Sequence, residues 1–232
     1  MDPLVEAFRL IVTGDLGVWS VILRSVRISG SALLISILIG LPIGAAIGLS
    51  RFRFRGSVVA LVNTGLALPP VVVGLGVFLL LSRSGPLGQL ELLYSPAAMV
   101  FAQAIIAGPY IAAVTLAAAE SVPGDVRLQA RALGAGRFQA ILLQLREVRT
   151  SLVAAVAAGF GAIISEVGAV MIVGGNILGE TRVMTTAIVV ETQRGNFAVA
   201  IAFGAVLMLV ALYINILLLL LGWRAKRRPL TA

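Results

Sequence analysis

Residues 28–50 read ISGSALLISILIGLPIGAAIGLS, a run of 23 residues without a charged side chain. A hydrocarbon core of ~30 Å needs ~20 apolar helical residues, so this run is long enough to cross a membrane once. Three further runs are free of charge and a fourth contains one charged residue: Gly56–Ser82, Leu92–Ala119, Gly195–Trp223, and Thr150–Gly179 with Glu166. None shows the period-two alternation of a barrel strand. The sequence therefore predicts an all-α, polytopic membrane helix bundle with five transmembrane helices.

The composition of the whole chain agrees with a membrane protein. Of its 232 residues, 59% are hydrophobic and 12% are charged, and the mean hydropathy is +1.06. A soluble domain usually carries about 25% charged residues. A net charge of +8 could indicate nucleic-acid binding, but the charges cluster in short segments between the apolar runs. We therefore expect membrane lipid, and no nucleic acid, as the surroundings of this chain.

Several residue types that catalytic and nucleotide sites need are missing from the sequence. The chain contains no cysteine and no histidine, which excludes thiolate, imidazole–metal and Ser-His chemistry. Its only lysine, Lys226, lies in a basic tail, so the phosphate-binding loop G-x-x-x-x-G-K-[ST] is also excluded. We expect no catalytic residue, no metal site and no cofactor in this chain, which is therefore not expected to be an enzyme.

The charged segments between the apolar runs predict the boundaries and the orientation. We expect an external segment at 1–27, a cytoplasmic loop at 120–149, an outer loop at 174–195, a basic tail at 224–232, and spans at about 28–50, 57–82, 96–119, 150–173 and 196–223. Twelve Lys and Arg residues lie on the side of the 120–149 loop and six on the other. Because cytoplasmic loops carry an excess of these residues, we expect the N-terminus outside and the C-terminus inside a cell (inner) membrane. Residues 3–12 form either a helix on the outer surface or a frayed terminus.

Prolines and glycines in the apolar runs indicate more than a membrane anchor. Four prolines are expected to break their helices: Pro42, Pro69, Pro70 and Pro109. Membrane proteins tolerate such breaks where protein or a cavity satisfies the freed backbone groups, so the breaks favour a transport bundle. Gly40, Gly44 and Gly48 form a smooth stripe, for which packing within the chain is favoured over a dimer contact. Five crossings cannot form two equal repeats, so we expect two copies to enclose a path as a homodimer.

The segment 120–149 is the largest feature on the predicted cytoplasmic side. Its sequence predicts a short helix at 126–133, a break at Gly134 and Gly136, and a second apolar helical face from Phe138 onwards. A short helix between two spans is a suitable shape for docking into a groove on another protein. A solvated loop with an amphipathic return helix is the alternative.

Within this segment, residues 131–135 (RALGA) and 137–140 (RFQA) resemble the EAA loop of ABC importer permeases, whose pattern is E-A-A-R-x-L-G-A. Leu128 and Gln129 differ from that pattern, whereas Ala130 and Gly134 match it. The resemblance implies a type I ABC importer permease-like fold with a cytoplasmic coupling helix. It implies ATPase-coupling roles for Leu128, Gln129, Ala130, Arg131, Leu133, Gly134, Ala135 and Arg137. The implied partners are two cytoplasmic ABC ATPase subunits, which bind ATP and Mg, and an extracytoplasmic substrate-binding protein.

A second resemblance points to the transported solute. The segment Ser165–Phe197 resembles the fourth helix and outer loop of tungstate-type permeases. Related molybdate and sulfate permeases share a core that Glu166, Gly168, Gly175 and Asn176 match. The resemblance implies a permease for tungstate or a related oxyanion. The alternatives are molybdate, sulfate or methionine as the solute, or a secondary transporter that needs no ATPase.

The outer loop carries hydrogen-bond donors, which a dianion needs in place of its hydration shell. We expect a partly re-entrant outer gate, and the candidate translocation and gate residues are Glu166, Gly175, Asn176, Thr181, Arg182, Thr185 and Thr186. Arg182 is either an exposed loop arginine or an anion contact. Glu166 is the only acidic residue in a predicted span, and it is a poor ligand for a dianion because like charges repel. A structural role at neighbouring helix ends is favoured over proton coupling.

Overall fold

Helices make up all the regular secondary structure in residues 3–13 and 16–226, the part of the chain that the computed structural model describes. In chain order they are α1 (Pro3–Val12), α2 (Leu16–Leu49), α3 (Arg55–Leu66), α4 (Pro70–Leu81), the short 3-10 helix η1 (Gly88–Leu90), α5 (Pro96–Glu120), α6 (Gly124–Ala132), α7 (Arg137–Glu147), α8 (Arg149–Ile164), α9 (Gly168–Gly174), α10 (Met184–Gln193) and α11 (Phe197–Lys226). Three stretches, in α2, α5 and α11, are long and apolar enough to cross a membrane, or up to five if the bent pairs α3–α4 and α7–α8 each form one span. The predicted all-α membrane bundle is confirmed.

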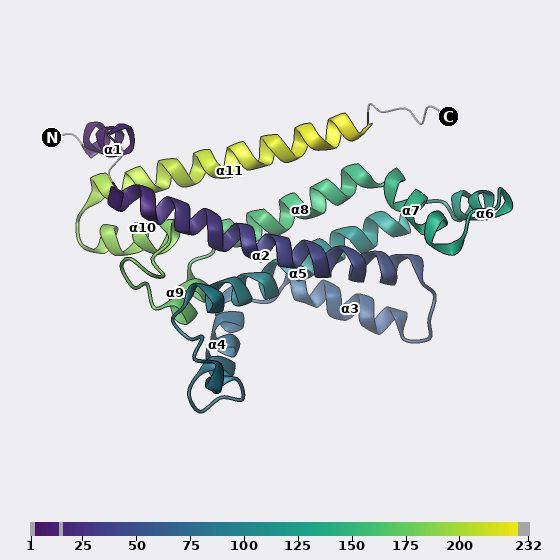
Figure 1. The fold of residues 1–232 in the computed structure, drawn as a ribbon, viewed down its shortest axis with the longest axis horizontal. Helices are drawn as coiled ribbons and strands as arrows, with labels where there is room; N and C mark the ends of the chain where they lie inside the picture. The colour runs from purple at the N-terminus through teal and green to yellow at the C-terminus, as the bar shows by residue number, and fades with distance from the viewer. Residues whose placement is uncertain (1–2, 14–15, 227–232) are drawn as a thin grey trace.

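The longest helices run along the long axis of the molecule, and different connections lie at its two ends (Figure 1). At one end are α6, its connection to α7, and the turn between α2 and α3. At the other end are α1 and α10. The segments predicted for the two sides of the membrane are therefore separated along this axis.

The contact between α2 and α5 forms the centre of the bundle, and the glycine stripe permits it. A Cβ atom on Gly44 would lie 2.3 Å from the carbonyl oxygen of Ala112, and one on Gly48 would lie 2.7 Å from the Cβ of Ala119. Gly40 has similarly little room beside α5. Small residues let membrane helices approach closely, and close van der Waals packing replaces the hydrophobic force that lipid does not supply. The predicted role of the stripe within one chain is confirmed.

The four prolines differ in their effect on the helices. Pro69 and Pro70 separate α3 from α4, and the directions of these two helices differ by 100°. A residue that precedes a proline is disfavoured in the α region. Leu68 and Pro69 each precede a proline, so two successive residues are driven out of the helical conformation. Pro42 and Pro109 instead lie inside the continuous helices α2 and α5, so the prediction that they break their helices is wrong. A single proline removes one backbone hydrogen bond, and neighbouring helices can offset that loss.

Two of the predicted spans have different helix boundaries in the structure. α2 begins at Leu16, so residues 16–27, expected in the external segment, form part of the first long helix. Arg24 and Arg27 precede the charge-free run. Because arginine is a good helix former, the helix nevertheless continues through both residues. The run expected to span at 150–173 is divided between α8 and α9, and Glu166 lies between these helices rather than inside one.

Three short helices agree with the sequence patterns. α1 matches the helix predicted at 3–12 and packs against α11, so the alternative of a frayed terminus is wrong. α6 and α7 are separated at residues 133–136, where Gly134 and Gly136 predict a break. The predicted basic tail continues α11 as far as Lys226, and residues 227–232 lie outside the described residues.

Candidate functional site

A cavity halfway along α5 lies where two interrupted helix pairs meet. Its volume is about 290 Å³, and its walls come from α5, from the α3–α4 break and from the α8–α9 break. Pro70, Tyr110, Ser165 and Glu166 are among the lining residues. The hydroxyl of Tyr110 donates a hydrogen bond to the carbonyl of Leu66, the last residue of α3, over 3.3 Å. In a membrane bundle, interrupted helices that meet at a cavity are typical of a transport path.

Glu166 is held in the wall of this cavity by its side chain and its backbone. Its Oε1 accepts a hydrogen bond from the amide of Ala169 in α9 (2.8 Å), and its carbonyl oxygen accepts one from the Thr185 hydroxyl (2.9 Å). The carboxylate caps the N-terminus of a helix, where negative charge is stabilised. Among the described residues that line the cavity, Glu166 is the only charged one. This geometry fits the structural role at a helix end and is unsuitable for holding an anion.

The predicted hydroxyl donors of the outer loop are buried and bonded within the chain. Thr181 Oγ1 donates to the carbonyl of Gly174 (2.5 Å) and accepts from the amide of Ile177 (2.8 Å). The hydroxyls of Thr185 and Thr186 also donate to backbone carbonyls. Thr181 therefore holds the connection between α9 and α10, whereas Thr185 ties α10 to the α8–α9 break.

Gly175 and Asn176 end α9 in left-handed conformations, with φ angles of 67° and 51°. A Cβ atom on Gly175 would lie 2.8 Å from the ring of Tyr94, so no larger residue fits there without movement. The amide of Tyr94, which also has a positive φ of 62°, donates to the carbonyl of Val173 (2.9 Å). The C-terminal end of α9 is thus held against the segment that precedes α5.

Arg182 is buried, with 9% of its surface exposed, so the alternative of an exposed loop arginine is wrong. Its Nε donates to Asn176 Oδ1 (3.3 Å), and its guanidinium forms an ion pair with Glu191 in α10 (3.4 Å). The Glu191 carboxylate also pairs with Arg194 (3.1 Å) and accepts a hydrogen bond from the side-chain Nδ2 of Asn196 (2.8 Å). Because the guanidinium of Arg182 is already paired with a buried carboxylate, an anion would have to compete with Glu191 for it.

Arg24 and Glu191 belong to this outer network, although the sequence patterns did not select either as a site residue. Arg24 in α2 donates hydrogen bonds to the carbonyls of Gly179 (2.6 Å) and Arg182 (3.1 Å). Their positions in the sequence could have identified them as site residues. Arg24 lies on the side with fewer positive charges, and Glu191 follows an apolar stretch. Charged residues in such surroundings are expected to find partners.

The predicted ATPase-coupling residues lie at the opposite end of the molecule, around the turn between α6 and α7 (Figure 1). Gly134 ends α6 with a φ of 91°, and its amide donates to the carbonyl of Arg131 (3.0 Å). The amide of Ala135 donates to the carbonyl of Ala130 (3.0 Å), which completes the end of the helix. Glycine adopts this left-handed conformation at little cost, and other residues do not.

This turn exposes large apolar side chains. Leu133 is 89% exposed and Phe138 is 77% exposed, and Leu128 is exposed on α6 beside them. Of the other predicted coupling residues, three are exposed (Gln129, Arg131 and Gly134), Ala130 is buried, Ala135 is half-buried, and Arg137 begins α7 with a side chain outside the described ones. A group of exposed apolar side chains that projects from the bundle is typical of a protein contact.

Comparisons with known proteins find relatives over most of the chain. The family model described as "Binding-protein-dependent transport system inner membrane component" matches residues 40–227. The "Probable anion ABC transporter permease protein" of Haloferax volcanii is 46% identical over 198 residues, which cover 83% of this chain and 85% of that protein. The "Tungstate uptake system permease protein TupB" of Peptoclostridium acidaminophilum is 39% identical over 219 residues, 93% of this chain and 96% of that protein. A solved structure of the inward-facing MetNI methionine ABC transporter has the same fold, with a TM-score of 0.68 and 18% identity over 91% of this chain and 95% of that one.

Proposed function

Because this chain belongs to the family of binding-protein-dependent transport system inner membrane components, we propose that it is the membrane-spanning permease of an ATP-driven importer for tungstate. The observation that carries the proposed substrate is the match to a permease of a tungstate uptake system, which extends over 93% of this chain. The Haloferax volcanii relative is named for an anion, the wider class to which tungstate belongs. The proposed cargo is therefore tungstate or a closely related oxyanion.

In this proposal two copies of the chain enclose the path, and the cavity between the α3–α4 and α8–α9 breaks of each copy faces a common axis. Tungstate is a dianion, so its path has to let it pass without holding it. A cavity whose only charged lining residue, among the described ones, is a carboxylate would hold a dianion weakly. An extracytoplasmic binding protein would then select the anion, and this chain would conduct it.

The energy for opening the path is proposed to come from two ATPase subunits that bind ATP and Mg²⁺. Moving a two-state population from 1:99 to 99:1 takes ~5.5 kcal/mol. This chain has no nucleotide-binding G-x-x-x-x-G-K-[ST] loop, so the energy of ATP would reach it through its contact with the ATPase subunits. The exposed side chains of Leu133 and Phe138 offer the apolar surface for such a contact.

Other solutes and another mechanism are the alternatives. Molybdate and sulfate are oxyanions of similar shape, and methionine is named only for a structural neighbour that is 18% identical, which indicates a fold and no solute. A secondary transporter would use the same helical path without an ATPase. It would need a coupling ion or proton, and Glu166 is the only acid among the described residues that line the cavity.

Reconstitution in liposomes separates these possibilities. The chain, together with its ATPase and binding protein, is expected to take up labelled tungstate only when ATP is hydrolysed. An excess of unlabelled molybdate is expected to compete less than tungstate, and sulfate less than molybdate. Uptake by the chain alone, with no nucleotide hydrolysed, would contradict the proposal. ATP-dependent uptake that prefers sulfate would contradict tungstate as the substrate but would agree with an ATP-driven importer.

A further inference from the structure

The turn between α2 and α3 alternates arginine and phenylalanine. Residues 51–55 read RFRFR, and the side chains of Phe52 and Phe54 are exposed. The guanidinium of Arg53 lies over the ring of Phe54, 5.9 Å from its centre. Exposed rings next to arginines are typical of the boundary between lipid and water, where the ring enters the lipid and the guanidinium stays among the headgroups.

The length of α2 places this turn at headgroup depth. From Arg24, which binds the outer loop, to Leu49, the last residue of α2, the helix rises ~38 Å at 1.5 Å per residue. A bilayer with its headgroup layers is ~40–45 Å thick. If Arg24 lies in one headgroup layer, the turn lies in the other. With the predicted orientation that layer is the cytoplasmic one, whose anionic lipids attract arginine.

A polar cavity of about 340 Å³ opens beside the turn. Its walls include Arg51, Arg55, Glu120 and Gln144, together with backbone at the end of α2 and the start of α6. Arg55 pairs with Glu120, so their charges cancel. Arg51 is exposed and has no ion-pair partner among the described residues, so the cavity keeps one positive charge.

Gln144 is the second sign that a ligand belongs in this cavity. Its side chain is 4% exposed, and its Oε1 has no hydrogen-bond partner among the described residues. A buried acceptor without a partner is costly unless a ligand or water donates to it. The cavity therefore offers an arginine for an anionic group, and a rotation of the Gln144 side-chain amide would present its oxygen to a hydroxyl group there.

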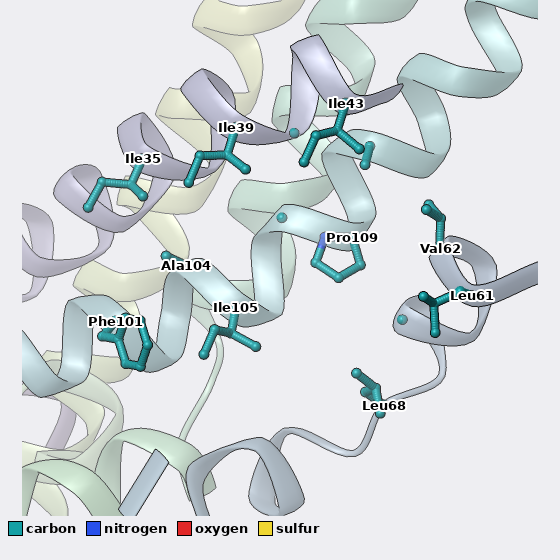
Figure 2. Close-up of a pocket in the computed structure, with 14 residues that line it drawn as sticks. Ile35, Ile39, Ile43, Leu61, Val62, Leu68, Phe101, Ala104, Ile105 and Pro109 are labelled. Atoms are coloured by element: carbon teal, nitrogen blue, oxygen red, sulfur yellow. The ribbon is translucent and has the colours of Figure 1, made fainter. Parts of the chain in front are cut away.

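An apolar groove of about 470 Å³ lies between α2, α3 and α5, nearer the middle of the bundle (Figure 2). Figure 2 shows Ile39 and Ile43 of α2 on one side of it and Leu61 of α3 on the other. Ala112 lines the groove and Ala119 lines the polar cavity, and these residues lie seven apart, ~10 Å along α5, which is less than the length of an acyl chain. An acyl chain can thus lie in the groove below a headgroup in the cavity.

We propose that this end of the bundle binds an anionic phospholipid of the phosphatidylglycerol type. The phosphate lies at Arg51, with Arg53 in the same headgroup layer. A glycerol hydroxyl of the headgroup donates to Gln144, and one acyl chain occupies the groove. The bound headgroup bridges the turn before α3 and the start of α6. It therefore connects the transport helices to the segment that projects from the bundle. The inference does not depend on which solute is transported.

Native mass spectrometry of the purified chain with added lipids tests the proposal. The chain is expected to retain phosphatidylglycerol in preference to phosphatidylcholine. Since each arginine at an anionic surface contributes about fivefold in affinity, R51Q should weaken retention about fivefold, and R51Q/R53Q about 30-fold. Gln144→Leu should remove the preference for phosphatidylglycerol over phosphatidic acid, which has no headgroup glycerol. Arg83→Gln is the matched control. Arg83 is also an exposed arginine, but it lies in the connection between α4 and η1, on the predicted outer side and not in the turn.

Three results would overturn the inference. Equal retention of phosphatidylglycerol and phosphatidylcholine by the unaltered chain would show that no headgroup site exists. Competition by inorganic phosphate at the same concentration as lipid would assign the cavity to a free anion. Loss of ATPase co-purification in R51Q, with lipid retention unchanged, would assign the turn to a protein contact. None of these measurements involves tungstate uptake, so their failure would leave the proposed function untouched.

Discussion

Gly44 shows how much one side-chain carbon matters where α2 meets α5. A Cβ there would lie 2.3 Å from the Ala112 carbonyl oxygen, so Gly44→Ala should push the helices apart. Overpacking of this kind costs about 1–3 kcal/mol, and we expect a lower thermal unfolding midpoint for the purified protein. Gly30 in the same helix is the matched control, because a Cβ there would have no atom within 4 Å. If Gly30→Ala lowered the midpoint equally, the close contact would not be the cause.

Glu166 makes a second prediction at the scale of one residue. In Glu166→Gln the amide oxygen can still accept the hydrogen bond from the Ala169 amide, so ATP-dependent uptake should persist with the same pH dependence. Glu166→Ala removes the cap, which costs about 0.5–2 kcal/mol, and should reduce the yield of assembled protein. Uptake and yield are measured side by side. A changed pH dependence in Glu166→Gln at normal yield would favour proton coupling over the structural role.

The α6–α7 turn is the element for which a partner is most directly testable. Leu133 is almost fully exposed, so Leu133→Asp should not affect folding. If Leu133 fills a pocket on the ATPase, the change should weaken association by roughly tenfold or more, as for a buried contact at an interface centre. The amount of ATPase that co-purifies with the tagged chain measures this association. Leu178→Asp, an equal change at another exposed leucine in the outer loop, is the control and should co-purify normally. Equal recovery with both variants would mean that the turn is not the contact.

The helices also show where local sequence is enough to predict structure. The glycines at 134 and 136 correctly separated α6 from α7, and consecutive prolines correctly marked the end of α3. Those effects act within a few residues, through φ restriction and lost hydrogen bonds. The division between α8 and α9 had no such signal, since no proline occurs there. It depends on contacts such as the one from Thr185 to the Glu166 carbonyl, which joins residues far apart in the chain.

At the scale of the whole molecule, the proposed homodimer can be tested, and α3 is a helix that it would cover. α3 is mostly apolar, yet none of its residues is buried within the chain. In the proposed homodimer a second copy, rather than lipid, would cover part of the side that faces away from α5. We therefore expect native mass spectrometry to give two copies of this chain, and two of each when the ATPase is present. A single copy that takes up solute when reconstituted would contradict the homodimer.

The sequence alone was sufficient to predict a polytopic helical membrane protein, the main helices and the turn that carries the exposed leucine. Apolar length, glycine and proline act locally, so each can be read from a few neighbouring residues. Only the tertiary structure decided that Arg182 is paired with Glu191, that Arg24 holds the outer loop, and that Glu166 caps α9 beside a cavity. Those outcomes depend on which distant segments meet inside the bundle. A buried charge takes whatever partner the packing brings to it, and no local pattern specifies that partner.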